Sequence, residues 1–237
     1  MEHSWLIVLL VLWALFLFGG FLFGKLDPEH IRRMPAWTRM ASSFTLVVVA
    51  WSQYGFARET SDSTFAILIG IGMTLGFIGD LFMAQLLPMK EYVLGGIGAF
   101  GLGHIAYIMA QIHFGNQNGL DQPSTRWSAI IVWLLIGLVG WYMVVYRTPN
   151  RTPLHYAALP YALLLSTTAG FATGLALQNP VFIPLAIGAA LFLLSDLILA
   201  ARLFNNLHFY LIDDVVWLFY GPAQMLIVCS IESTISI

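Results

Sequence analysis

Charged residues are scarce in this 237-residue chain. Asp, Glu, Lys and Arg together make up 9% of its residues, whereas they make up about a quarter of an ordinary soluble domain. Apolar residues account for 59%, and the mean hydropathy is +0.82. This balance excludes a water-soluble globular domain and predicts an integral membrane protein.

Cysteine and an excess of positive charge are also missing. A single cysteine, Cys229, excludes an internal disulfide framework and a thiolate metal cluster. Ten Lys and Arg against twelve Asp and Glu give a net charge of −2, so the chain lacks the basic face that neutralises nucleic-acid phosphates. Nucleic-acid binding is therefore not expected.

Long apolar runs, by contrast, are abundant. A helix that crosses about 30 Å of hydrocarbon needs about 20 mainly apolar residues. Runs of this length, separated by short polar segments, favour a helical bundle over a barrel of alternating strands. We predict an all-α, polytopic membrane protein whose residues 1–237 form a single transmembrane domain. The eight expected spans lie near residues 5–24, 40–57, 64–88, 92–114, 127–146, 154–177, 180–203 and 211–231.

The basic residues predict the orientation of these spans, because Lys and Arg accumulate in cytoplasmic loops. Eight of them follow odd-numbered spans, and only Arg58 and Arg126 lie on the opposite side. Both termini are therefore expected outside the cytoplasm, and the short loops favour a bacterial cytoplasmic (inner) membrane. Asn150-Arg151-Thr152 matches a glycosylation acceptor, but this topology places it on the cytoplasmic side, so we interpret it as a chance match.

Two of the expected spans resemble each other. Residues 71–84 (IGMTLGFIGDLFMA) and 187–200 (IGAALFLLSDLILA) agree at six of fourteen positions, at a constant offset of 116. Apolar helices also resemble each other through composition alone, so both duplication and chance stay open. A true duplication would give halves near 1–118 and 119–237, each with four spans and inserted the same way up. Asp80 and Asp196 would then lie at the same depth, in the cytoplasmic half of the membrane.

These two aspartates are the main candidates for chemistry. A carboxylate inside a span costs about 2.5 to 3.5 kcal/mol on insertion scales, so an intramembrane Asp is a functional candidate by default. Asp80 follows Gly72 and Gly76 at helical spacing, which also suits a packing seam with a hydrogen-bonded carboxyl. Asp196 precedes Arg202 by less than two turns, which also suits an ion pair at the helix end.

A polar stripe marks the expected span at 92–114. His104, Tyr107 and Gln111 share one helical face. This stripe suits a cavity lining, and it equally suits a histidine that is only hydrogen-bonded in place. The chain has no HxxxH or HExxH pair, and no GxSxG motif accompanies Ser195. We therefore expect neither a metal centre nor a serine nucleophile.

The last expected span carries a second polar stripe. Asp213, Trp217, Tyr220 and Gln224 fall on one face at spacings of four, three and four residues. For Asp213, a place in a binding site and a helix cap both stay open. Asp214 is interpreted as a cap, because an acid near a helix N-terminus complements the helix dipole.

Four short runs in this chain resemble the YhhN-like family of eight-span membrane proteins, in the family's order and over nearly the whole length. They read GDLFMA at 79–84, FGLGHIAYIMA at 100–110, GAALFLLSDLILA at 188–200 and YGPAQMLI at 220–227. The characterised members are lysoplasmalogenases, also called alkenylglycerophosphocholine or alkenylglycerophosphoethanolamine hydrolases. Gly221 stands where a second aromatic residue is expected. The matching positions are Gly79, Asp80, Gly103, His104, Tyr107, Ser195, Asp196, Tyr220 and Gln224.

The resemblance implies a membrane hydrolase without a cofactor, which splits the vinyl-ether bond of a lysoplasmalogen into a fatty aldehyde and a glycerophospho-base. Protonation of the vinyl β-carbon develops an oxocarbenium ion, water adds to it, and the hemiacetal collapses. Two nearby buried carboxyl groups suit this chemistry, because burial and a like charge favour the protonated form of one of them. We expect Asp80 and Asp196 to divide the acid and base roles, with either assignment open. The other expected contributors are His104 and Tyr107, which orient water or the ether oxygen, Ser195, Tyr220, Gln224 and Asp213 in substrate binding, and Arg32, Arg33, Arg147 or Arg202 as phosphate ligands.

A proton-coupled carrier of small solutes or lipids is the main alternative. Parallel repeats, glycine-rich helices and carboxylates near the membrane midplane are also typical of such transporters. A non-catalytic assembly or lipid-sensing protein is the third class, and it would tolerate loss of the aspartates. A carrier would move its solute intact across sealed vesicles, whereas a hydrolase would release aldehyde in detergent without a gradient.

Overall fold

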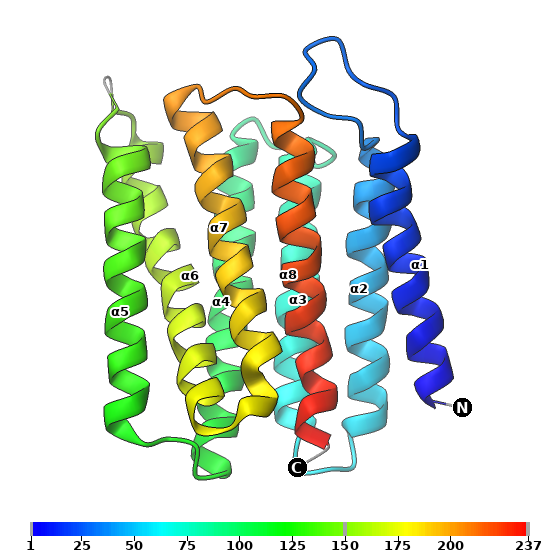
Figure 1. The fold of residues 1–237 in the computed structure, drawn as a ribbon, viewed down its shortest axis with the longest axis vertical. Coiled ribbons are helices and arrows are strands. Elements are labelled where there is room, and N and C mark those ends of the chain that lie inside the picture. The colour runs from blue at the N-terminus through cyan, green and yellow to red at the C-terminus, as the bar shows by residue number, and fades with distance from the viewer. Residues whose placement is uncertain (1, 149–150, 236–237) are drawn as a thin grey trace.

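The structure is a computed structural model that describes residues 2–148 and 151–235, and it contains no β-strand within them. The predicted all-α class is therefore confirmed. Asn150, the first residue of the acceptor triplet, lies outside the described residues. The long helices of the described chain, which lie side by side in Figure 1, are α1 (Glu2–Phe23), α2 (Ala36–Ala57), α3 (Ser63–Met83), α4 (Tyr92–Gln117), α5 (Pro123–Trp141), α6 (Pro153–Gln178), α7 (Ile183–Asn205) and α8 (Ile212–Ile235).

Seven of the eight long helices in the described residues are long and apolar enough to cross a membrane, as in a multi-pass membrane protein. The exception is α2, which runs beside α1 in Figure 1 and also packs against α3. Its composition is less apolar because it carries polar residues that the neighbouring helices bury. These residues are Thr38, Ser42, Ser43, Thr45 and Gln53.

The third span ends earlier than expected. The hydropathy of residues 64–88 predicts a helix to residue 88, but α3 ends at Met83. Gln85 has a φ of +58°, a left-handed conformation that an α-helix cannot contain. Apolar composition therefore continues past the helix into the turn that leads to α4.

The start of α1 and the end of α8 lie at one end of the bundle, opposite the loops that follow odd-numbered helices (Figure 1). The loops joining α1 to α2, α3 to α4, α5 to α6 and α7 to α8 thus share a single end. Arg32, Arg39, Arg147 and Arg202 lie in these loops or in the adjoining helix ends. We call this the basic end.

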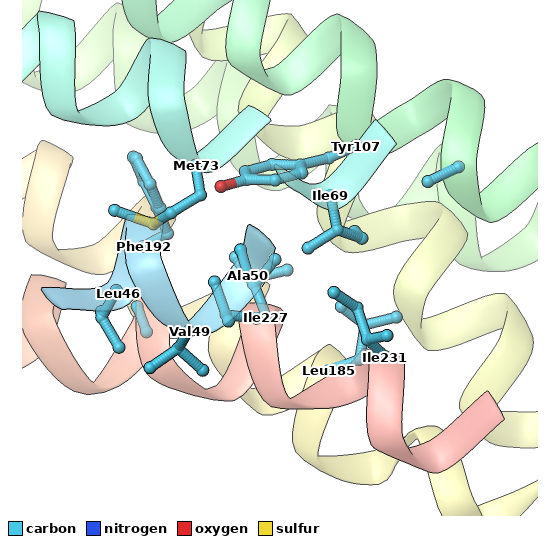
Figure 2. Packing of buried hydrophobic residues seen from close by; sticks show 14 of the residues in the cluster. Leu46, Val49, Ala50, Ile69, Met73, Tyr107, Leu185, Phe192, Ile227 and Ile231 are labelled. Carbon is cyan, nitrogen blue, oxygen red and sulfur yellow. The ribbon is translucent and has the colours of Figure 1, made fainter. Parts of the chain in front are cut away.

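Six of the long helices form a closed ring in the order α2, α3, α4, α6, α7, α8. Each contacts the next, and α8 returns to α2. Outside the ring, α1 packs against α2 and α8, and α5 packs against α6 and α7. Apolar side chains fill the ring away from the basic end, as Figure 2 shows for a part of this core. Its labelled residues are Leu46, Val49, Ala50, Ile69, Met73, Tyr107, Leu185, Phe192, Ile227 and Ile231.

Glycines let α3 and α4 approach closely. A Cβ atom added to Gly103 on α4 would lie 3.0 Å from the carbonyl oxygen of Gly72 on α3. A backbone atom cannot rotate away as a flexible side chain can, so this close contact favours glycine at position 103. This close approach fixes α4 against the helix that carries Asp80.

Gly103→Leu is expected to lower the melting temperature of the purified protein in detergent. Overpacking of a close helix contact costs about 1 to 3 kcal/mol. The matched control is Gly98→Leu on the same helix, where nothing lies within 4 Å of an added Cβ atom. Thermal unfolding followed by circular dichroism measures both variants, and equal melting temperatures would contradict the close packing of α3 on α4.

Candidate functional site

A cavity of about 570 Å³ lies within the ring at its basic end. We call it the chamber. Its wall combines side chains from the α1–α2 loop, α2, α3, α4, α7 and α8, including both intramembrane aspartates, Asp80 and Asp196. Two carboxyl groups that are 116 residues apart in the sequence therefore face one space.

Asp80 is fixed by hydroxyl groups from two other helices. Ser43 on α2 donates to its Oδ2 atom at 2.5 Å, and Tyr220 on α8 donates to the same atom at 3.0 Å. Only 4% of Asp80 is exposed. The residue thus combines the hydrogen bonding expected of a packing seam with a place in the chamber wall.

Asp196 is held by the neighbouring helix α6. The Tyr161 hydroxyl donates to its Oδ2 atom, and Ser195 Oγ lies 3.4 Å from its Oδ1 atom. The ion pair that the sequence allowed between Asp196 and Arg202 is wrong, because Arg202 instead pairs with Asp213 at the start of α8. Asp196 therefore faces the chamber without an ion pair to any basic side chain in the part of the chain that the structure describes.

Hydrogen bonds connect Asp80 to residues behind the chamber wall. The Tyr107 hydroxyl donates to Oε1 of Gln224 at 3.0 Å, and Nε2 of Gln224 donates to the Tyr220 hydroxyl at 3.1 Å. Tyr220 in turn donates to Asp80. Tyr107 and Gln224, expected at the substrate, are thus linked to the chamber through Tyr220, which does line it.

His104 lies deeper, among aromatic rings. Its Nδ1 atom is 2.9 Å from Oγ1 of Thr168, and its ring meets Phe192 edge-on with centroids 4.5 Å apart. Its Nε2 atom is buried and has no hydrogen-bond partner in the described residues. Ser195 is fully buried, and its hydroxyl donates to the Phe192 carbonyl at 2.8 Å. Both residues therefore belong to the packing behind the chamber.

Three arginines line the chamber toward the basic end: Arg32, Arg39 and Arg202. Arg202 is paired with Asp213, which also lines the chamber. The Arg39 guanidinium lies 5.6 Å from the centroid of the Trp217 ring, and its Nε atom is buried with no hydrogen-bond partner among the described residues. The Nε–H group of Arg39 is therefore available to donate a hydrogen bond to a molecule bound in the chamber.

The start of α8 is attached to the α1–α2 loop. Asp214 lies in the first turn of α8, where its charge complements the helix dipole as expected, and its carboxylate also accepts backbone N–H groups of Arg33 and Met34, at 2.5 and 3.0 Å. Arg33, a predicted phosphate ligand, lies in the α1–α2 loop and does not line the chamber. The two residues bonded to Asp214, Arg33 and Met34, thus lie between Arg32 and Arg39 in the sequence.

Two backbone hydrogen bonds complete this attachment. The Leu211 N–H donates to the His30 carbonyl at 2.9 Å, and the Asp213 N–H donates to the Ile31 carbonyl at 3.0 Å. His30 and Leu211 both have positive φ values, +57° and +60°. The loop is therefore fixed to α8 by backbone and side-chain contacts together.

A second, apolar cavity of about 80 Å³ adjoins the chamber. We call it the groove. It is lined by α4, α5, α6, α7, the end of α3 and the π-helical segment Tyr142–Tyr146 that continues α5. Asp196 and Phe100 line both the groove and the chamber, whereas Asp80 lines the chamber alone. The groove thus meets the polar space beside Asp196.

Sequence reasoning missed three residues of this site: Ser43, Tyr161 and Arg39. Ser43 belongs to a pair of serines within an apolar run, which is a usable signal for a buried polar contact. Tyr161 gives no such signal, because aromatic residues are common in all the spans. Arg39 entered the sequence argument only as one of the loop charges that set the topology.

Comparison with known proteins gives a family match. The model of the YhhN family matches residues 34–231. No curated protein and no solved structure matches the chain. The matched range begins just before α2 and includes Asp80, Asp196 and all other chamber-lining residues except Arg32. In the described residues, no group of three or more His, Cys, Asp or Glu could hold a metal ion.

Proposed function

We propose that this chain, which belongs to the YhhN family, is a membrane hydrolase of the lysoplasmalogenase type that cleaves the vinyl-ether bond of a single-chain phospholipid. One observation carries the proposal: Asp80 and Asp196 face a single chamber that is lined by arginines and that adjoins an apolar groove beside Asp196. Such a gradient of polarity matches an amphiphile whose reactive bond lies between a phosphate head group and a hydrocarbon chain. In this proposal the two carboxyls serve as the acid and the base that the reaction needs.

The head group binds at the basic end of the chamber. Arg32 and Arg39 supply guanidinium donors there, and such donors form strong charge-assisted hydrogen bonds to phosphate oxygens. Arg202 is already paired with Asp213, so it contributes charge while its position stays fixed. The glycerophosphate then lies between the arginines and the two aspartates.

Asp196 acts as the acid in this proposal and Asp80 as the base. The vinyl β-carbon lies on the chain side of the bond, and Asp196 is the aspartate that lines both the groove and the chamber. Asp196 transfers its proton to that carbon, which leaves an oxocarbenium ion at the carbon bearing oxygen. Asp80 takes a proton from a chamber water as the water oxygen bonds to this cation. As the hemiacetal collapses to an aldehyde, Asp196 takes the proton of its hydroxyl and Asp80 returns a proton to the departing glycerol oxygen. Both carboxyls thereby regain their starting state, and one water is consumed overall.

The remaining polar residues position these carboxyls. Ser43 and Tyr220 hold Asp80, and Tyr161 holds Asp196. A catalytic group must be held close to its productive geometry, and residues that lock it in place contribute to the rate. Other residues expected at the substrate act through this layer, namely His104, Tyr107, Ser195 and Gln224.

We also propose eight spans in a single domain, with two four-helix repeats in parallel orientation. The ring supports this arrangement, because adding four to each helix number maps the α2–α3, α3–α4 and α4–α6 contacts onto α6–α7, α7–α8 and α8–α2. The same shift exchanges the helices that carry Asp80 and Asp196. Concentration of arginine at one end supports a chamber that opens to the cytoplasm of a bacterial cytoplasmic membrane, with both termini outside.

The test is release of fatty aldehyde from choline and ethanolamine lysoplasmalogens by the purified protein in detergent. Aldehyde is expected without any ion gradient, measured by coupled NADH oxidation through an added alcohol dehydrogenase. The saturated alkyl ether of the same chain is the control, and it should yield no aldehyde because it has no double bond to protonate. Failure with both lysoplasmalogens, together with transport of the intact lipid into sealed vesicles, would establish the carrier instead.

A further inference from the structure

We propose that the groove holds the first part of the substrate's hydrocarbon chain, next to the reacting bond; this inference rests on the proposed hydrolysis and names where its substrate's chain binds. The chain would run from the chamber past Asp196 and between α4, α6 and α7. The head group would stay in the chamber with the arginines. Substrate choice is then set by the groove as well as by the carboxyls.

The groove has the lining that a hydrocarbon chain requires. Apart from Asp196 and the Tyr161 hydroxyl, which bond to each other, its lining side chains are apolar. The chamber, by contrast, is lined by three arginines and three aspartates. A hydrocarbon chain attached to a phosphate in the chamber therefore enters an apolar environment where the groove meets the chamber, beside Asp196.

The size of the groove suits a short stretch of chain. A cavity of about 150 Å³ is known to hold one benzene molecule. The groove measures about 80 Å³, so it accommodates a few carbons of one chain next to Asp196.

Small side chains on α6 and α7 leave this space free. Ala158 and Ala162 lie one turn apart on α6, and Ala200 faces them from α7. On the far side, Trp141 is fixed by a hydrogen bond from its Nε1 atom to the His155 carbonyl at 3.0 Å. A larger residue at position 162 would therefore fill the groove, because the opposite wall cannot easily withdraw.

The π-helical segment shapes this wall. Tyr142–Tyr146 adopts the wider π turn at the end of α5, and Val145 within it lines the groove. Such segments are rare and occur frequently at functional sites, where they shift the register of a helix by one residue. Here the shift coincides with the part of α5 that borders the groove.

Ala162→Leu tests the inference. We compare kcat/KM for a lysoplasmalogen with a 16-carbon chain and for one with a 4-carbon chain, which ends near Asp196. The variant is expected to lower the long-chain to short-chain ratio by about tenfold, the scale of steric discrimination in an apolar pocket. Ala157→Leu, the same change on α6 outside the groove lining, should leave that ratio within about twofold. An equal loss for both chain lengths, or no loss, would overturn the inference.

A second measurement does not depend on hydrolysis. A lysophosphocholine with a saturated ether chain and a diazirine near its head end is photolysed with the protein, and the labelled peptides are mapped by mass spectrometry. Label is expected on the groove-lining parts of α6 and α7, lost in Ala162→Leu and kept in Ala157→Leu. Aldehyde release with label elsewhere would refute the groove and leave the hydrolase standing. Label in the groove without aldehyde release would refute the hydrolase alone.

Discussion

Asp196→Asn and Asp80→Asn are each expected to lower kcat for aldehyde release by about 10²- to 10⁴-fold, the usual contribution of a general acid or base. Asparagine keeps the shape of the side chain and its ability to accept the hydroxyls of Tyr161 or Ser43. It removes the proton that the reaction transfers. Steady-state kinetics at saturating lysoplasmalogen measure the loss, and KM is expected to change little.

The matched control for both aspartate variants is Asp121→Asn, in the exposed loop before α5, which should keep wild-type kcat. Melting temperatures of all three variants show whether they fold. Reaction in D₂O adds a mechanistic readout, because protonation of the β-carbon places one deuterium at carbon 2 of the aldehyde. Wild-type turnover in both Asp80→Asn and Asp196→Asn would show that the pair is not the catalytic machinery.

Arg39→Gln is expected to raise KM by about 10- to 100-fold with little change in kcat, because a hydrogen bond to a charged group contributes about 1.5 to 3 kcal/mol. The affected substrate is a lysoplasmalogen with a phosphate head group. An alkenylglycerol, which has the same vinyl ether and no phosphate, should show the same KM with the variant and with the wild-type protein. Competition kinetics with both substrates measure the difference.

Arg147→Gln is the matched control for the phosphate contact. Arg147 lies at the same end of the bundle, is exposed, and stands outside the chamber lining. Its loss should leave both KM values unchanged. If Arg39→Gln weakened the alkenylglycerol as much as the phospholipid, Arg39 would act on the shape of the chamber and not on the phosphate.

Sequence patterns predicted what depends on a single helix. Hydropathy located the helices, and helical spacing put Asp213, Trp217 and Tyr220 on the face of α8 that lines the chamber. The free-energy cost of placing a carboxylate inside a membrane span singled out Asp80 and Asp196. These signals are local, so one sequence is enough to reveal them.

Contacts between helices could not be predicted in the same way. Nothing in the spacing of α6 indicates that Tyr161 reaches Asp196, and nothing near Arg202 indicates that it prefers Asp213 to Asp196. Helix packing decides these pairs, and packing depends on side chains from several segments at once. The turn at Gln85 was missed for a related reason, since hydropathy reports apolarity and is insensitive to a backbone that leaves the helix.

The attachment of the α1–α2 loop to α8 gives the entrance of the chamber a permanent shape. Arg32 and Arg39 flank the two residues whose backbone N–H groups bond to Asp214. The backbone between these two arginines is thus held in place before any lipid arrives, and an incoming head group does not have to order a flexible segment. Binding to this preorganised entrance avoids the loss of conformational entropy that the ordering of a disordered loop would add.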